Sequence, residues 1–191
     1  GYPADQAEPV REALESLVAA GKIRAYGWST DFPDRAEVFA KGKSCTAIQL
    51  QLNVLDDNPD VVALCEKHNL AAINRGPLAM GLLTGKYNPS SAPSTDDVRG
   101  EHSPDWMKYF KDGKPNPIWL EKMEAVREIL TSSGRTLAQG ALAWLWGRSE
   151  TTIPIPGFRT AAQVIDNCGA LAHGPLTAGQ MAEIEAILGR N

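Results

Sequence analysis

The chain has 191 residues, of which 43% are hydrophobic and 22% are charged, and its net charge is −4. This composition is ordinary for a soluble globular protein with one sizeable core. Scattered lysines and arginines argue against a nucleic-acid partner, which needs a concentrated basic face, and no apolar run is long enough to span a membrane.

The first part of the chain alternates helices with strands at a constant interval. An amphipathic helix ends at Gly21, and a later helix opens at Asn58. Strands start near Ile23, Ala47 and Ala71, which are 24 residues apart each time (47 − 23 and 71 − 47). The predicted strands cover residues 22–30, 47–53 and 70–75. Short βα units of this kind predict a parallel sheet.

The second part begins with a long segment, residues 83–117, that is rich in proline, glycine and serine. Aromatic residues are interleaved in it, so we expect a lid that docks over cofactor or substrate rather than a linker. Regular periodicity then predicts helices and one more strand, and Thr177 with Gln180 predicts a capping box at the last helix. These elements cover residues 118–130, 137–146, 151–156, 161–171 and 176 onward.

Four strands with their helices make half of an eight-stranded barrel. They cannot close into a barrel of normal size, and both outer strands would present unpaired edges. We therefore expect an α/β fold of the (β/α)8 TIM-barrel type. The chain would be a partial barrel of about four βα units with a long loop and a C-terminal helix, prone to self-association through its open edges.

The cysteines and the N-terminus bear on the origin of the chain. Cys45, Cys65 and Cys168 are odd in number and far apart, which favours a reducing compartment and predicts a cytoplasmic protein. Cys65 and Cys168 fall in helical patterns and are expected to be buried. Neither a secretory signal nor an initiator methionine is visible, so we expect a removed leader or, preferably, a piece of a longer chain.

Two turns after strands have the chemistry of an anion site. The turn from Gly157 to Thr160 combines glycine, Arg159 and a helix N-terminus, which together favour a phosphate. Alternatively, Thr160 and Gln163 form only a capping box and Arg159 is solvated. The segment 76–87 has three glycines and ends near Lys86, which suits a loop over an anionic ligand, although a plain turn with a surface lysine has the same pattern.

These segments resemble one known family. Residues 76–87 are similar to the cofactor-loop signature of aldo-keto reductases, residues 21–29 look like their fifth-strand signature, and residues 155–159 with Gln163 and Asn167 resemble their C-terminal motif. Order and spacing agree along essentially the whole chain. The resemblance implies a barrel that binds NADP(H) and reduces aldehyde or ketone carbonyls by hydride transfer. Residues 1–191 would be the C-terminal half of one barrel domain, with the N-terminal half absent.

The resemblance also implies a role for individual residues. Ser29, Thr30 and Gln49 would contact the nicotinamide carboxamide, although many members have asparagine at the position of Thr30. Arg75 stands where an aromatic residue often stacks on the nicotinamide ring. The cofactor loop would contribute Gly76, Pro77, Leu78, Gly81 and Lys86, the last three along the pyrophosphate. The C-terminal motif would contribute Gly157 to the cofactor site. It would place Arg159 and Gln163 by the 2′-phosphate, which favours NADP over NAD, and Asp166 and Asn167 by the adenine.

No catalytic residue is assigned. The family's proton donor is a tyrosine assisted by lysine, aspartate and histidine, all from the first four strands, so the chain alone is expected to be inactive. That motif includes none of the chain's own tyrosines, Tyr2, Tyr26, Tyr87 and Tyr109. The spacing of metal ligands is absent among its histidines, His68, His102 and His173. One alternative is a non-catalytic NADPH-binding module resembling channel-associated β-subunits, which upstream sequence would distinguish. Another is an unrelated phosphate-binding barrel enzyme.

Overall fold

The computed structural model describes residues 4–190, with side chains from residue 6 onward, so Tyr2 lies outside the described residues. The chain divides into two compact units, which are described separately below. Unit 1 consists of Gly1–Leu52, Asp56–Arg75 and Arg148–Ile155. Unit 2 consists of Asn53–Leu55, Gly76–Gly147 and Pro156–Asn191.

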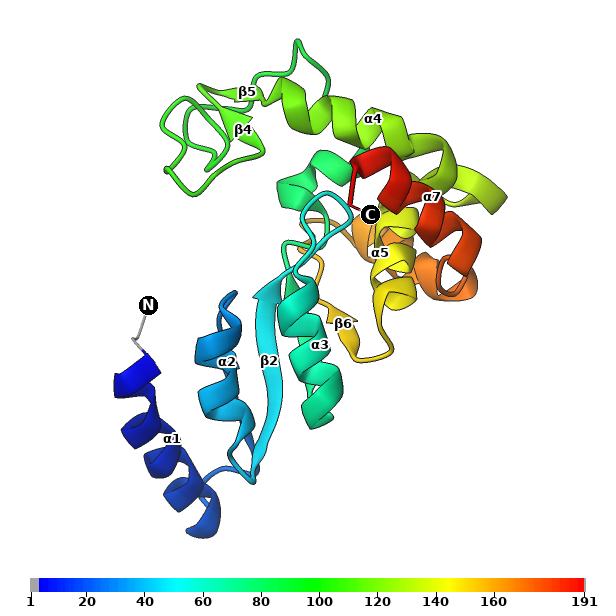
Figure 1. Ribbon diagram of the computed structural model, residues 1–191. Coiled ribbons are helices and arrows are strands. Elements are labelled where there is room, and N and C mark those ends of the chain that lie inside the picture. Colours follow the sequence, from blue (N-terminus) through cyan, green and yellow to red (C-terminus); the bar gives the residue numbers. More distant parts are fainter. Residues whose placement is uncertain (1–3, 191) are drawn as a thin grey trace. The chain divides into compact units, whose positions relative to one another are not determined.

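Unit 1 is a parallel sheet with helices (Figure 1). The strands are β1 (Tyr26–Ser29), β2 (Cys45–Gln51), β3 (Ala71–Arg75) and β6 (Thr152–Pro154), paired in the order β1-β2-β3-β6. The helices are α1 (Ala4–Ala19), α2 (Pro33–Ala40) and α3 (Pro59–His68). The sheet confirms the predicted parallel α/β arrangement, and Asn58 caps α3 by accepting a hydrogen bond from the backbone N–H of Val61 at 3.3 Å.

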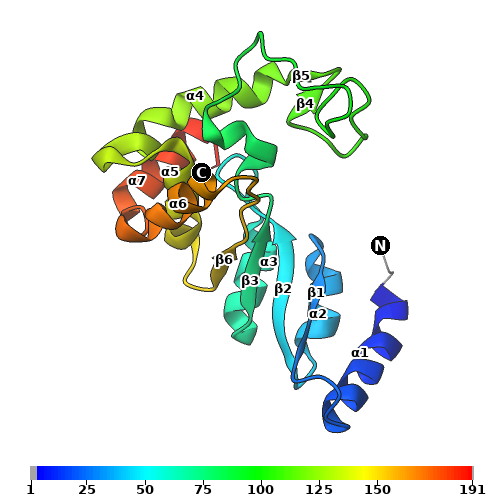
Figure 2. The ribbon, with the colours of Figure 1, turned by 180° about the vertical axis from the view of Figure 1, so that it is seen from behind.

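The two faces of this sheet differ in burial. Ile48, Leu50 and Asn74 are fully buried on the face that α2 and α3 cover. Figure 2, seen from behind, shows the strands of unit 1 on the near side of these helices. Because side chains alternate along a strand, the opposite face carries residues that are only partly buried. They are Ala47, Gln49, Gln51, Ile73 and Arg75, with the exposed Ile153 of β6.

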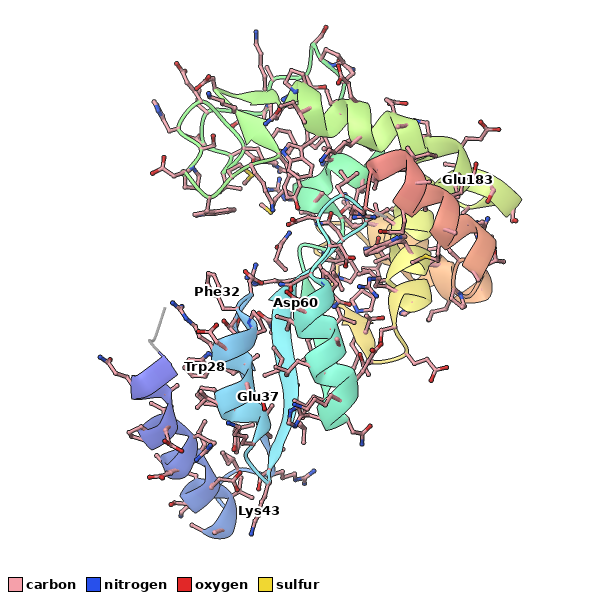
Figure 3. All side chains as sticks on the ribbon, in the orientation of Figure 1. Trp28, Phe32, Glu37, Lys43, Asp60 and Glu183 are labelled. Atoms are coloured by element: carbon pink, nitrogen blue, oxygen red, sulfur yellow. The ribbon has the colours of Figure 1, made fainter. Side chains whose placement is uncertain are left out.

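Packing and one hydrogen-bond network hold β1 against the helices of unit 1. The ring of Trp28, the residue labelled on β1 in Figure 3, stacks on Phe39 of α2, and their centroids are 4.0 Å apart. The hydroxyl of Tyr26 donates to the Glu15 carboxylate of α1 at 2.6 Å, and the backbone N–H of Ser44 donates to the same oxygen at 2.9 Å. The hydrogen bond from Tyr26 holds the pKa of Glu15 below its usual value. These contacts hold Tyr26 and Trp28 of β1 against α1 and α2.

Unit 2 is mainly helical. Its helices are α4 (Pro117–Thr131), α5 (Leu137–Arg148, ending at the unit boundary), α6 (Ala161–Gly169) and α7 (Ala178–Leu188). Short 3-10 turns cover Ala79–Thr84 (η1), Ser132–Gly134 (η2) and Ala170–Ala172 (η3), and β4 (Phe110–Lys111) pairs with β5 (Lys114–Pro115) in a hairpin. Helix α5 is almost entirely buried, which explains why its apolar residues follow no single stripe. The predicted capping box of Thr177 with Gln180 is confirmed.

Three details differ from the prediction. The first strand begins at Tyr26 rather than residue 22, because the N–H of Lys22 donates to Leu17 O at 2.9 Å and still belongs to the turn that ends α1. The segment 83–117, predicted as a long loop, contains the β4–β5 hairpin. Cys168 is exposed, whereas Cys65 is buried as predicted, because α6 buries none of its residues.

Candidate functional site

In unit 1, the predicted nicotinamide residues lie at the carboxyl ends of β1 and β2. Ser29 and Gln49 are register partners, and the Ser29 hydroxyl lies 3.4 Å from Gln49 Oε1. Thr30 is buried, and its hydroxyl accepts a hydrogen bond from the backbone N–H of Phe32 at 3.2 Å. The structure therefore brings Ser29 and Gln49 together on the less buried face of the sheet, while the hydroxyl of Thr30 is engaged in the turn that leads into α2.

An ionic network joins the ends of β1, β2 and β3. The Arg75 guanidinium pairs with the Asp31 carboxylate through Nη2 and donates to Gln51 Oε1 through Nη1 at 3.1 Å. The other Asp31 oxygen accepts the backbone N–H of Gln51 at 2.6 Å. The side chains of Arg75 and Asp31 are each 37% exposed. Arg75, predicted as the stacking residue, is thus bound by Gln51 of the neighbouring strand β2 and by Asp31, which lies beyond the end of β1.

In unit 2, the cofactor-loop segment makes an unusual turn. Ala79, Met80 and Gly81 all have positive φ, at 47°, 55° and 92°. Left-handed backbone is costly for alanine and methionine and tends to persist at ligand sites that the surrounding structure holds in place. A Cβ added to Gly81 would lie 3.3 Å from Arg99 Nη1 and 3.7 Å from Lys86 Cε, so it would fill the space beside two cations.

The long loop of unit 2 supplies the groups that hold this turn. Arg99 donates to the Met80 carbonyl at 3.0 Å and to both oxygens of Asp97 at 2.7 and 2.5 Å. Arg159 Nη2 lies 3.8 Å from the same Asp97 carboxylate, and its side chain is 80% exposed. Lys86 Nζ and the Arg99 guanidinium lie 4.9 and 5.6 Å from the centre of the Tyr87 ring. The two predicted phosphate ligands therefore each lie near Arg99, Lys86 at the Tyr87 ring and Arg159 at the Asp97 carboxylate.

Asp97 carries the charge that organises this cluster. The hydrogen bonds from Arg99 hold the pKa of the Asp97 carboxyl well below its usual range, and the same hydrogen bonds raise the pKa of Arg99. Both side chains are largely buried, at 14% and 12% exposure. One carboxylate thus faces two cations, Arg99 and Arg159, so the cluster keeps an excess of positive charge. A group with several anionic oxygens matches this donor set.

The C-terminal motif is ordered by helix capping. Gln163 Oε1 accepts the backbone N–H groups of Arg159 at 2.6 Å and Thr160 at 3.3 Å, and the Thr160 hydroxyl accepts the N–H of Gln163 at 3.3 Å. The predicted capping box is confirmed, and Gln163 also holds the backbone N–H of Arg159. Nothing lies within 4 Å of a Cβ added to Gly157, so a ligand could approach this backbone.

The remaining predicted residues of unit 2 have mixed surroundings. Asp166 accepts hydrogen bonds from the Thr136 hydroxyl at 3.0 Å and from Gln139 at 2.9 Å, which tie α6 to the start of α5. Asn167 is partly buried. Gly76 has a φ of 64°, and its carbonyl accepts a hydrogen bond from the buried Asn53 at 3.0 Å. Pro77 follows in this turn, and Leu78 is buried beneath it.

Several residues of these networks were not predicted. Asn53 also lies 2.9 Å from the Tyr109 hydroxyl, which fixes the long loop to the turn after β3. Asp31, Asp97 and Arg99 were missed because no periodicity marks a loop residue that pairs across 19 to 62 positions (159 − 97). The only local signal was the opposite charge of Asp97 and Arg99 two residues apart.

Comparison with known proteins decides the family. The model of the Aldo/keto reductase family matches residues 2–189. The chain belongs to this family. A glycerol dehydrogenase structure from Gluconobacter oxydans is 27% identical and superposes with a TM-score of 0.77, covering 99% of this chain and 55% of that protein. The fold is therefore that of the (β/α)8 TIM-barrel family, represented in the described residues by a four-stranded portion.

Two curated relatives of this aldo-keto reductase chain are longer. An aldo-keto reductase from Schizosaccharomyces pombe, whose name specifies NADP(+), is 29% identical over 86% of this chain and 48% of the relative. A chloroplastic pyridoxal reductase from Arabidopsis thaliana is 28% identical over 84% of this chain and 42% of the relative. The chain spans about half the length of these curated relatives.

Between residues 4 and 190, no set of three histidine, cysteine, aspartate or glutamate side chains is placed to hold a metal ion. No helix in the same range combines the length and apolar character needed to cross a membrane.

Proposed function

We propose that the chain is the C-terminal half of an NADPH-dependent reductase of aldehydes or ketones, and that residues 1–191 form one half-barrel domain of it. The single observation that carries the proposal is that Lys86 and Arg99 lie beside the left-handed turn at Gly81, while Arg159 approaches the Asp97 carboxylate that Arg99 binds. The chemistry of these donors fits the phosphates of NADP(H). The name of the S. pombe relative supports the same cofactor.

The two residue sets have separate tasks in this proposal. Arg159 would pair with the 2′-phosphate, while Lys86 and the backbone at Leu78 and Gly81 would hold the pyrophosphate. In unit 1, Ser29 and Gln49 would bind the nicotinamide carboxamide, and Arg75 would support the ring. Bound NADPH would supply the hydride that reduces the carbonyl carbon. No proton donor is assigned within the chain, so we expect no carbonyl reduction by it alone.

Binding of nucleotides by the 191-residue chain tests the proposal. NADPH should quench tryptophan fluorescence, whereas a simple sugar phosphate should not. Arg159→Ala should lower the affinity for NADPH about tenfold or more and leave the affinity for NADH nearly unchanged, because only NADPH carries the 2′-phosphate. Arg35→Ala, which replaces a partly exposed arginine of α2 in unit 1, is the matched control. Equal quenching by NADPH and sugar phosphate would instead favour an unrelated phosphate-binding barrel.

We further propose that the chain is cytoplasmic and acts on small carbonyl compounds, without nucleic-acid or membrane partners. Its cysteines are free, which is consistent with a reducing compartment. The outer strands β1 and β6 favour self-association, because parallel sheets are normally paired and covered on both faces. Analytical ultracentrifugation should detect dimers or larger species, and a monodisperse monomer at high protein concentration would contradict this part of the proposal.

A further inference from the structure

Arg75, the residue proposed to support the nicotinamide ring, forms an ion pair with Asp31. Arg75 comes from the end of β3, and Asp31 directly follows β1, with β2 between them. The two side chains are 44 positions apart in sequence and are joined through Arg75 Nη2, while Gln51 of β2 binds both partners. The orientation of the Arg75 guanidinium is therefore defined by two partners, Gln51 in β2 and Asp31 after β1.

An unpaired guanidinium beside a nicotinamide ring would affect the binding of the two oxidation states differently. The oxidised ring is cationic and the reduced ring is neutral, so an uncompensated cation would weaken NADP+ binding relative to NADPH. A carboxylate paired with that guanidinium offsets most of its field, because two opposite charges in contact act as a dipole at longer range. Asp31 thereby determines how much of the Arg75 charge a bound ring would experience.

We propose that Asp31 is a tuning residue, which sets the preference of the site for NADP+ or NADPH by neutralising and orienting Arg75. This inference rests on the proposed function, because it assumes that NADP(H) binds at these strand ends. It assigns Asp31 no contact with the reacting atoms. Its effect passes through the Arg75 guanidinium, which also donates a hydrogen bond to the Gln51 side chain.

The test is the ratio of two dissociation constants, Kd for NADP+ divided by Kd for NADPH, measured for the 191-residue chain by isothermal titration calorimetry. Asp31→Asn should raise the ratio about threefold to tenfold, because the Arg75 charge is then unbalanced in a partly exposed site. Arg75→Gln should lower it by a similar factor, because the Asp31 carboxylate is left to attract the cationic ring. The double variant should lie within about twofold of the wild-type ratio.

A purely structural role would not produce opposite shifts. If the pair only stabilised the arrangement of β1 and β3, both single variants would bind both nucleotides more weakly, and the ratio of the two dissociation constants would not change. Adenosine 2′,5′-bisphosphate, which has no nicotinamide, serves as the control, and its affinity should be the same in all four proteins. Asp34→Asn, an exposed carboxylate in the first turn of α2, is the matched charge control and should not move the ratio.

The outcomes separate this inference from the proposed function. A folded wild-type chain that binds none of the three nucleotides overturns the proposed function and this inference with it. A chain that binds all three, with one ratio shared by every variant, overturns the inference alone. Opposite shifts in the two single variants, with the bisphosphate affinity constant, establish Asp31 as the tuning residue.

Discussion

The guanidinium of Arg99 donates two hydrogen bonds to the carboxylate of Asp97, at 2.7 and 2.5 Å, and a third to the carbonyl of Met80 at 3.0 Å. The pair thus links the long loop to a left-handed turn that alanine and methionine would not adopt unaided. Because Arg159 lies against the same carboxylate, one charged group fixes the loop, the turn and the exposed arginine within unit 2.

Removing the charge of Asp97 should loosen this loop. In Asp97→Asn, amide hydrogen exchange across residues 88–103 should accelerate about tenfold, because a hydrogen bond to a charged group contributes about 1.5 kcal/mol or more. Asp96→Asn removes an equal charge from the neighbouring exposed position and should leave the exchange rates unchanged. Equal acceleration in both variants would mean that net charge, and not the bonds from Arg99, orders the loop.

Acid should loosen the same loop. The pKa of Asp97 is lower in the folded protein than in the unfolded chain, where the pKa of an aspartate is about 3.9. Its contribution to stability is therefore complete above about pH 4 and is lost as the pH falls through the folded value. Proteolysis within residues 88–103, with an acid-active protease, should stay slow down to about pH 4 and accelerate below it. The Asp97→Asn variant should lack this dependence.

Two helical glycines should respond oppositely to alanine. A Cβ on Gly140 of α5 would lie 2.1 Å from the Leu130 carbonyl oxygen, so Gly140→Ala must separate α5 from α4. We expect a loss of about 1–3 kcal/mol in the free energy of unfolding. Gly179 of α7 has nothing within 4 Å of its Cβ, and Gly179→Ala should gain about 0.5–1 kcal/mol. Urea denaturation of both variants checks this, and a neutral Gly140→Ala would refute the packing of α4 on α5.

The three cysteines should differ in reactivity. Burial raises the pKa of the Cys65 thiol to about 11, and burial also raises that of Cys45, whereas Cys168 is exposed. At pH 8 an aromatic disulfide reagent should modify one thiol per folded chain and three in denaturant. Cys168→Ser should abolish the reaction of the folded chain, and rapid modification that persists in this variant would contradict the burial of the other two thiols.

Local sequence determined most of the fold. Alternating apolar periods and short turns predicted four parallel strands, and capping residues such as Thr160 and Thr177 predicted where two helices begin. These features depend on neighbours within a few positions, so they can be predicted without a tertiary structure. The glycines of residues 76–87 and Arg159 also identified the proposed cofactor segments, because a family signature is a local pattern.

Only the tertiary structure decided which charges meet. Asp31 pairs with Arg75 across 44 positions, and Asp97 lies between Arg99 and the distant Arg159. Sequence alone could not choose among the chain's many acidic residues, because an ion pair depends on strand order and on the path of an irregular loop. Burial of Cys168 was mispredicted for a related reason, since periodicity identifies the apolar face of a helix but not whether another element covers it.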